Sequence, residues 1–184
     1  MRKLIAAINM TIDGFCDHDA VNPDEEIHQH YTNLLRNADA ILFGRITYQL
    51  MQYWQNLLKN PSGVKSMDDF AQAIDKIPKI VFSHTLKETG WESARLAERG
   101  IEEEVRRLKN QSGKDILVGS PGLIVALTQA GLIDEYQLCI HPVIAGKGLP
   151  LFKNITHSRS LTLEKTKRFG SGAILLYYTC IPVP

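Results

Sequence analysis

The chain has 184 residues, 44% of them hydrophobic, and its 21 basic and 20 acidic side chains leave a formal net charge of +1. A chain of this length can bury about two thirds of its unfolded surface, so we expect one α/β domain over residues 1–184. No long block of like charge is present. This argues against a nucleic-acid or membrane surface and favours a small-molecule ligand.

The cysteines and the amino-terminal segment indicate the compartment. The three cysteines, Cys16, Cys139 and Cys180, are odd in number and widely spaced, which argues against a disulfide framework and against a zinc site. The apolar run from Leu4 to Ile8 is too short for a signal-peptide core or a membrane span. We therefore expect a cytoplasmic protein that begins with a strand.

Strands and helices alternate through most of the chain. A strand over 4–9 is followed by a loop and by a helix over 24–36, in which Ile27, Tyr31, Leu34 and Leu35 recur at helical spacing. Further strands are predicted at 40–43, 79–83 and 115–118, and further helices from near Thr47 to 60, at 68–75, at 101–109 and around 123–127. This alternation predicts a parallel sheet covered by helices on both faces.

The carboxyl-terminal third has a different pattern. Longer strands are expected at 135–143, 160–168 and 173–181, and Gly170-Ser171-Gly172 is typical of a tight turn between the last two. An antiparallel hairpin should therefore complete the sheet. Gly146-Lys147-Gly148 fits a turn among these strands better than it fits a nucleotide-binding loop.

Glycine and polar residues follow several of the predicted strands. In the segment 42–48, an apolar strand runs into Gly44 and Arg45 and then into a helix that begins near Thr47. Glycine permits close approach of a ligand, arginine supplies a permanent forked cation, and free N–H groups at a helix start attract anions. The segment thus predicts phosphate binding, although such junctions also occur as plain connections and such arginines as solvated surface residues.

Several motifs occur together in a fixed order. They are Met10-Thr11-Ile12-Asp13-Gly14-Phe15, the segment 42–48, Val81-Phe82-Ser83-His84-Thr85-Leu86, Asp115-Ile116-Leu117-Val118-Gly119-Ser120, and Leu132-Ile133-Asp134-Glu135 leading to Gly146-Lys147-Gly148-Leu149-Pro150-Leu151-Phe152. Together they resemble the dihydrofolate-reductase-like family, specifically stand-alone relatives of the reductase domain of the bifunctional riboflavin-biosynthesis deaminase/reductase. The resemblance implies a three-layer αβα fold with a mixed, mostly parallel sheet that ends in an antiparallel hairpin.

The resemblance also implies a cofactor and the residues that bind it. Three loops would hold NADPH: the first and third around the pyrophosphate, and the second near the adenosine ribose and its 2′-phosphate. The implied cofactor-binding residues are Gly44, Arg45, Thr47, Ser83, His84, Gly119, Ser120, Pro121, Gly122 and Leu123. A Gly-rich turn between a strand and a helix can also form without any ligand.

The chain departs from the family pattern at two of these positions and at Val118. His84 stands where an arginine commonly follows the serine, and histidine is mostly neutral near pH 7, so the preference for NADPH over NADH is less secure. Ser120 replaces a glycine but keeps its backbone N–H, and Pro121 suits the first turn of a helix. Val118 replaces a carboxylate that commonly faces the substrate, which argues against a phosphoribosyl substrate.

Reduction of a ring or an imine usually needs a nearby acid to protonate the adjacent nitrogen. Asp13 is the candidate catalytic residue, because the resemblance places the nicotinamide and the substrate beside its loop. Asp-Gly is also a favourite turn pair, so a purely structural role is open. Asp24, Glu25 and Glu26 are alternatives, although acids at a helix start usually serve as caps and dipole partners.

The predicted activity is the NADPH-dependent reduction of a small heterocycle, with riboflavin- or folate-type chemistry. The substrate would be pterin-like or 5-amino-6-(5-phosphoribosylamino)uracil-like, and the protein a homodimer. A non-catalytic module that senses NADPH is the alternative. No metal site is expected, because His28 and His30 lie on different faces of their helix and no zinc-deaminase motif occurs.

Overall fold

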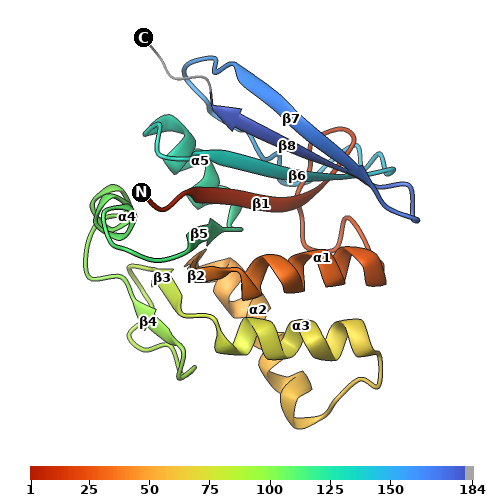
Figure 1. Ribbon diagram of the computed structural model, residues 1–184, viewed down its shortest axis with the longest axis horizontal. Helices are drawn as coiled ribbons and strands as arrows, with labels where there is room; N and C mark the ends of the chain where they lie inside the picture. Colours follow the sequence, from red (N-terminus) through yellow and green to blue (C-terminus); the bar gives the residue numbers. More distant parts are fainter. Residues whose placement is uncertain (181–184) are drawn as a thin grey trace.

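Eight strands form a single mixed sheet in the computed structural model, which describes residues 1–180 (Figure 1). The strands are β1 (Leu4–Thr11), β2 (Ala38–Gly44), β3 (Lys79–Phe82), β4 (Ala94–Leu96), β5 (Asp115–Val118), β6 (Glu135–His141), β7 (Leu161–Arg168) and β8 (Ile174–Cys180). Their order across the sheet is β4-β3-β2-β5-β1-β6-β8-β7. Strands β1 to β6 run parallel, while β8 pairs antiparallel with β6 and with β7.

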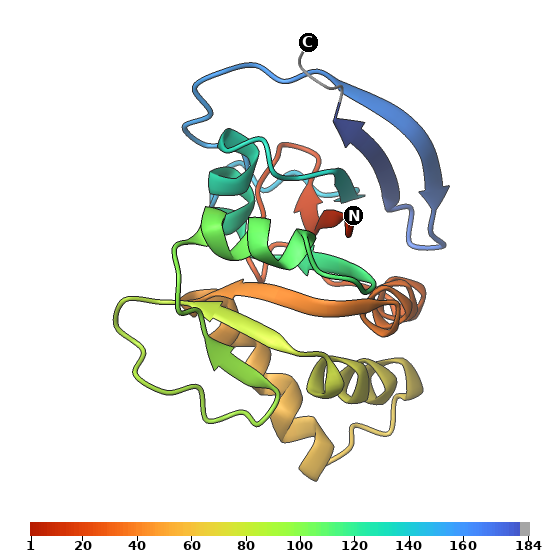
Figure 2. The same cartoon turned by 60° about the vertical axis from the view of Figure 1, so that its left-hand side comes forward.

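Helices cover both faces of this sheet. They are α1 (Glu25–Arg36), α2 (Arg45–Lys59), α3 (Lys65–Lys76), α4 (Ile101–Lys109) and α5 (Pro121–Gln129). Figure 2 shows α4 and α5 in front of the sheet, on the side opposite to α1, α2 and α3. The predicted three-layer αβα architecture with a carboxyl-terminal antiparallel hairpin is therefore confirmed. None of the helices within residues 1–180 is both long and apolar enough to cross a membrane.

Alternation along the strands produces two separate apolar layers. On β1, Leu4, Ala6 and Ile8 pack with α4 and α5, whereas Ile5 packs on the opposite side with α1, α2 and α3. Successive side chains of a strand point to opposite faces, so a strand buried on both sides reads as a continuous apolar run. This explains the largely apolar runs of the central strands, such as residues 4–8 in β1, 40–43 in β2 and 116–118 in β5.

The register of the central strands places their carboxyl ends side by side. Leu42 of β2 is paired with Val118 of β5, and Val118 is paired with Ala6 of β1. The segments that follow β2 and β5 therefore leave the sheet as neighbours. In open sheets of this kind, the crevice outside the carboxyl ends of the strands is the usual ligand site.

The structure corrects several of the predicted boundaries. Helix α2 begins at Arg45, earlier than the position near Thr47 expected from the sequence, because Gly44 already serves as its N-cap. Strand β4 was not predicted: it is only three residues long and too short to show a period. The expected strand over 173–181 is observed as Ile174–Cys180, and Ile181 lies outside the described residues.

The sequence places apolar residues at Leu138, Ile140, Val143 and Ile144, which we expect to form an apolar surface for the homodimer, and the structure corrects this expectation for β6. Leu138 is buried and Ile140 is half-buried against the core, because β6 is not an edge strand but lies between β1 and β8. Val143 and Ile144, which follow β6, are exposed as expected.

Candidate functional site

A cleft of about 800 Å³ opens at the carboxyl ends of β1, β2, β3 and β5. Its walls come from the segments that follow these strands and from the sides of α1, α2 and α3. All ten predicted cofactor-binding residues line this cleft: Gly44, Arg45, Thr47, Ser83, His84, Gly119, Ser120, Pro121, Gly122 and Leu123. Residues that are far apart in the sequence thus meet in one site.

The first predicted loop is the junction between β2 and α2. Gly44 is the N-cap of α2 in extended conformation, and its own backbone N–H donates to Ser120 Oγ at 2.9 Å. Arg45 is exposed and donates through Nη1 to Gln49 Oε1 at 3.2 Å, one helical turn further on. The Arg45 guanidinium therefore has most of its donors available to a ligand.

The third predicted loop is built around two small residues. A Cβ on Gly119 would lie 3.4 Å from the carbonyl oxygen of Ala7, so glycine allows β5 to continue close to β1. Ser120 is almost fully buried, and its hydroxyl accepts the Gly44 N–H instead of facing a ligand. Pro121 occupies the first turn of α5 as predicted, where its missing N–H is harmless.

The two helices that start at the cleft differ from the other helices. Neither α2 nor α5 has a side-chain cap or an acidic residue in its first turn. In contrast, α1, α3 and α4 each carry acidic residues in the first turn. The unpaired N–H groups and the positive dipole ends of α2 and α5 are thus left for an anion that enters the cleft.

The second predicted loop combines a structural and an exposed residue. The Ser83 hydroxyl accepts the N–H groups of Thr85 at 3.2 Å and Leu86 at 2.9 Å, which fixes the turn after β3. His84 is exposed at the rim of the cleft. Within this loop, His84 and Thr85 have exposed side chains that line the cleft and can contact a ligand.

Asp13 lies in a different environment from the predicted cofactor residues, outside the cleft lining. Its carboxylate accepts hydrogen bonds from Thr11 Oγ1 at 2.6 Å, Gly146 N at 2.7 Å and Ala145 N at 3.1 Å. The Thr11 and Gly146 bonds lower the pKa of Asp13 to about 2. A carboxylate that stays ionised well below neutral pH is poorly suited to donate a proton, so this geometry favours the turn role.

The alternative acids at the start of α1 are also used structurally. Asp24 caps α1 by accepting the Ile27 N–H at 2.9 Å, and Glu26 accepts the Gly170 N–H at 2.6 Å from the β7–β8 turn. Glu25 is exposed, and none of the three side chains lines the cleft. This placement agrees with the prediction that acids at a helix start usually serve as caps and dipole partners.

Sequence reasoning missed the residues that line the other end of the cleft. Asp17 and His18 come from the loop after β1, Asn9 from β1 itself, and His28 and Tyr31 from α1. Asp17 Oδ2 accepts the Leu149 N–H at 2.6 Å. The polar stretch before Pro23 was predicted only as a loop, and nothing in its pattern shows which carboxylate faces inward.

A small polar network forms part of this end of the cleft. Asn9 Oδ1 lies 3.3 Å from the Tyr31 hydroxyl, which donates to it, and 3.0 Å from Nε2 of the buried His141. Burial lowers the pKa of His141 and raises the pKa of Tyr31 well above its ordinary value. Both side chains are therefore neutral near pH 7, and the amide of Asn9 is held in one orientation.

Aromatic side chains form the adjoining wall. The rings of Trp54 and Phe70 have centroids 4.6 Å apart, and His28 lies 5.7 Å from Trp54 and 6.1 Å from Phe70. Desolvation lowers the pKa of His28, so this imidazole is also neutral near pH 7. The cleft is thus polar where α2 and α5 begin and largely apolar between α1, α2 and α3.

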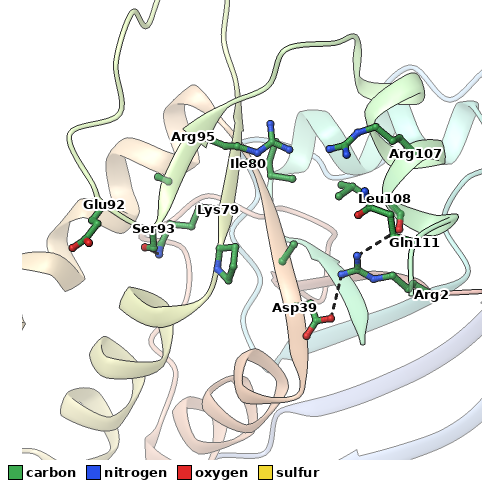
Figure 3. Close-up of a pocket in the computed structure, with 13 residues that line it drawn as sticks. Arg2, Asp39, Lys79, Ile80, Glu92, Ser93, Arg95, Arg107, Leu108 and Gln111 are labelled. Carbon is green, nitrogen blue, oxygen red and sulfur yellow. Dashed lines mark hydrogen bonds and ion pairs between the residues drawn. The ribbon is translucent and has the colours of Figure 1, made fainter. Parts of the chain in front are cut away.

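A second pocket, of about 440 Å³, lies at the amino ends of β2, β3 and β4 (Figure 3). It contains four cationic side chains, but these already have partners. Arg2 donates to the carbonyl oxygen of Lys114, and its Nη2 lies 3.7 Å from Asp39 Oδ2. Arg95 and Arg107 both bind the buried carboxylate of Glu104, and Lys79 Nζ donates to Ser93 Oγ at 2.7 Å and to two backbone carbonyls. We assign this pocket a structural role and place the functional site at the opposite end of the sheet.

Among residues 1–180, no three His, Cys, Asp or Glu side chains are grouped so that they could hold a metal ion. The features that define the site are instead the two uncapped helix starts, the adjacent arginine and the apolar wall. Together with the sheet order, they define a dihydrofolate-reductase-like fold in which two helix N-termini open onto a cleft at the strand ends.

The chain belongs to the RibD C-terminal domain family, which it matches over residues 2–175. This is a family of reductase domains, so membership supports oxidoreductase chemistry in general. The chain is 32% identical to protein YyaP of Bacillus subtilis (strain 168) over 96% of its own length and 94% of that protein. It is 26% identical to protein YwjB of the same organism, over 96% and 97%.

Solved structures with the same fold include three that are informative. A protein assigned to riboflavin biosynthesis in Shewanella sp. PV-4 has a TM-score of 0.74 at 19% identity, with 98% of this chain and 99% of that chain covered. A pyrimidine reductase-like protein from Corynebacterium diphtheriae has a TM-score of 0.64 at 16% identity, with 99% and 93% covered.

The third solved structure is a longer protein. It is the diaminohydroxyphosphoribosylaminopyrimidine deaminase/5-amino-6-(5-phosphoribosylamino)uracil reductase of Thermotoga maritima, with a TM-score of 0.64 at 15% identity. The match covers 98% of this chain but 57% of that protein. At these identities the likeness shows the fold.

Proposed function

We propose that the protein is an NADPH-dependent reductase of a small heterocyclic compound. The observation that carries the proposal is the meeting of the α2 and α5 N-termini and Arg45 in one cleft, within a family of reductase domains. A dinucleotide needs anion-binding groups for its pyrophosphate beside an apolar surface for its rings, and the cleft provides both.

The residues of the chain fit such a cofactor in three respects. Arg45 and the N–H groups of the first turns of α2 and α5 would bind phosphate oxygens, and Gly119 lines the cleft beside them. His84 stands where the second loop would meet the ribose, which makes it the candidate for contact with a 2′-phosphate. When bound, NADPH supplies a hydride.

Replacement of Arg45 tests the cofactor assignment. A hydrogen bond to a charged group contributes about 1.5–3 kcal/mol, so Arg45→Ala should weaken NADPH binding roughly ten- to hundredfold. Isothermal titration calorimetry of the wild type and the variant measures this change. Arg106→Ala, on the exposed side of α4, is the matched control and should bind NADPH as the wild type does.

A turnover assay separates the reductase from a sensor module. Steady NADPH oxidation with at least one member of a panel of pterins and aminopyrimidines would support the reductase. Tight NADPH binding without oxidation across the panel would favour a module that only senses the cofactor. Unchanged NADPH affinity in the Arg45 variant would refute the role of this arginine.

A further inference from the structure

The cleft has two chemically different ends. One end, here called the cofactor end, is formed by the starts of α2 and α5. It contains the N–H groups and the arginine that suit a dinucleotide. The other end, here called the ring pocket, is lined by Asn9, Asp17, His18, His28, Tyr31, Leu34, Leu50, Met51, Trp54 and Phe70. On the proposed function, on which this inference rests, the ring pocket is where the compound to be reduced binds.

The charges of the cleft argue against a phosphorylated compound. Within the described part of the chain, Arg45 is the one lysine or arginine that lines the cleft, and Asp17 is the one carboxylate. Arg45 belongs to the cofactor end, and His28 is neutral near pH 7 because burial lowers its pKa. A phosphate in the ring pocket would therefore meet a carboxylate without a permanent cation to balance it.

The aromatic wall suits the face of a flat ring. Trp54, Phe70 and His28 form a contiguous group on α1, α2 and α3, in which His28 meets Trp54 edge-on and the other two ring pairs are tilted, with Leu34, Leu50 and Met51 beside it. Rings pack against such surfaces through apolar contact and offset or edge-on aromatic geometry. A ribosyl phosphate chain would gain little from this wall.

Asn9 and Asp17 provide polar groups that can recognise the edge of that ring. Asn9 Oδ1 is occupied by Tyr31 and His141, so the donor left on Asn9 is its Nδ2 amide group. Asp17 uses Oδ2 for the Leu149 N–H, and its Oδ1 accepts no hydrogen bond from the described residues. A donor and a charged acceptor in one apolar pocket match a ring with a carbonyl and adjacent amino or imino N–H groups.

We propose that the ring pocket binds an unphosphorylated flat heterocycle with an amide-like edge, which packs on Trp54 and Phe70 and is held by Asp17 and Asn9. This substrate class differs from the phosphoribosyl compound named for the Thermotoga maritima protein. The difference follows from the single cation of the cleft, which is already assigned to the cofactor.

A matched pair of ligands tests this assignment. We would titrate 6-(hydroxymethyl)pterin and its phosphate ester into the protein with NADP⁺ present, and measure both affinities by calorimetry. The unphosphorylated pterin should bind at least about tenfold more tightly, since the ester adds a charge that the pocket does not balance. Equal or tighter binding of the ester would overturn the proposal, as would the absence of binding by either compound.

Variants in the loop after β1 show whether Asp17 is responsible. Asp17→Asn should weaken binding of the unphosphorylated pterin by about tenfold or more, while Asp19→Asn, on the exposed side of the same loop, should leave it unchanged. Asp17→Lys should shift the preference toward the phosphate ester. Equal affinities in the wild type and both Asp17 variants would overturn the assignment of Asp17.

NADPH titration of the wild type and the same variants distinguishes failure of the proposed substrate class from failure of the proposed reductase function. If NADPH binds normally and the pterin preference fails, the substrate class is wrong and the proposed reductase stands. If NADPH itself does not bind the wild-type protein, the proposed function is wrong, whatever the pterin titrations give.

Discussion

Asp13 is the residue at which a catalytic and a structural role can be separated most directly. The Asp13→Asn variant keeps the Asx-Gly turn but removes the charge that accepts from Thr11, Ala145 and Gly146. One of these donors would then face the amide group of the asparagine. We expect a lower melting temperature and turnover within a few-fold of the wild type, measured by thermal denaturation and by NADPH oxidation.

The opposite result would restore a catalytic role to Asp13. Loss of a general acid typically lowers turnover by about a hundredfold or more. Such a loss in Asp13→Asn, with NADPH affinity and melting temperature preserved, would contradict the structural interpretation.

His30 should make the folded state sensitive to acid. Burial beside Phe169 and Tyr177, with Lys167 and Lys165 nearby, lowers its pKa from 6.5 to about 4. As pH falls through this window, the unfolded chain takes up the proton before the folded one. The free energy of unfolding therefore decreases from about pH 6.5 toward about pH 4 and is highest, for this group, above that window.

Replacement of His30 tests this acid sensitivity. The His30→Gln variant should lose less stability than the wild type between about pH 7 and about pH 5, measured by urea denaturation at each pH. His157→Gln, at an exposed position, serves as the control. An identical pH dependence in the wild type and the His30 variant would refute the assignment.

Residue roles were only partly predictable from the sequence. The ten predicted cofactor-binding positions lie at or just after the ends of strands, so a pattern that locates strand ends also locates them. The orientation of the Asp13 and Asp17 carboxylates depends on backbone N–H groups that donate to them. These belong to Ala145, Gly146 and Leu149, more than a hundred positions further along the chain. No local pattern contains that information, so the sequence could suggest Asp13 but could not find Asp17.

At the scale of elements, Ser120 connects two of the three segments that form the cofactor end. Its buried hydroxyl accepts the Gly44 N–H and thereby joins the start of α5 to the start of α2. Ser120→Ala would leave this N–H without its partner, at a cost of about 1–3 kcal/mol. We expect a lower free energy of unfolding and weaker NADPH binding, measured by urea denaturation and calorimetry.

A surface serine provides the comparison for this variant. Ser112→Ala, in the exposed turn after α4, should change neither stability nor NADPH binding. Wild-type behaviour of both variants would show that the bond between Ser120 and Gly44 does not support the site.

The elements that the sequence predicted best are those with the clearest apolar pattern. Helix α4 and strand β5 were predicted at their observed boundaries, because each has a strong period or a continuous apolar run between turn residues. Strand β4 is short and half-exposed, and it forms only because β3 offers an edge for it to pair with. Pairing between distant segments is not visible in a local pattern.

At the scale of the whole molecule, five of the exposed apolar side chains lie on two neighbouring loops. Ile12 follows β1, while Val143, Ile144, Leu149 and Phe152 follow β6, and all five are exposed. The two loops are joined by hydrogen bonds, including Ile12 N to Val143 O at 2.9 Å and Cys16 N to Leu149 O at 2.9 Å. These five residues, here called the loop patch, form the surface on which we base the expected association.

We predict a homodimer of two-fold symmetry that covers the loop patch, because apolar residues grouped on adjoining loops commonly mark an interface. Light scattering at tens of micromolar should give twice the chain mass of 20.7 kDa. Ile144→Glu, at the most exposed position of the patch, should shift the protein toward monomer, whereas Val64→Glu, at the exposed start of α3, should not. A wild-type protein that scatters as a monomer would refute the dimer, and a dimer that persists in the Ile144 variant would move the interface away from the loop patch.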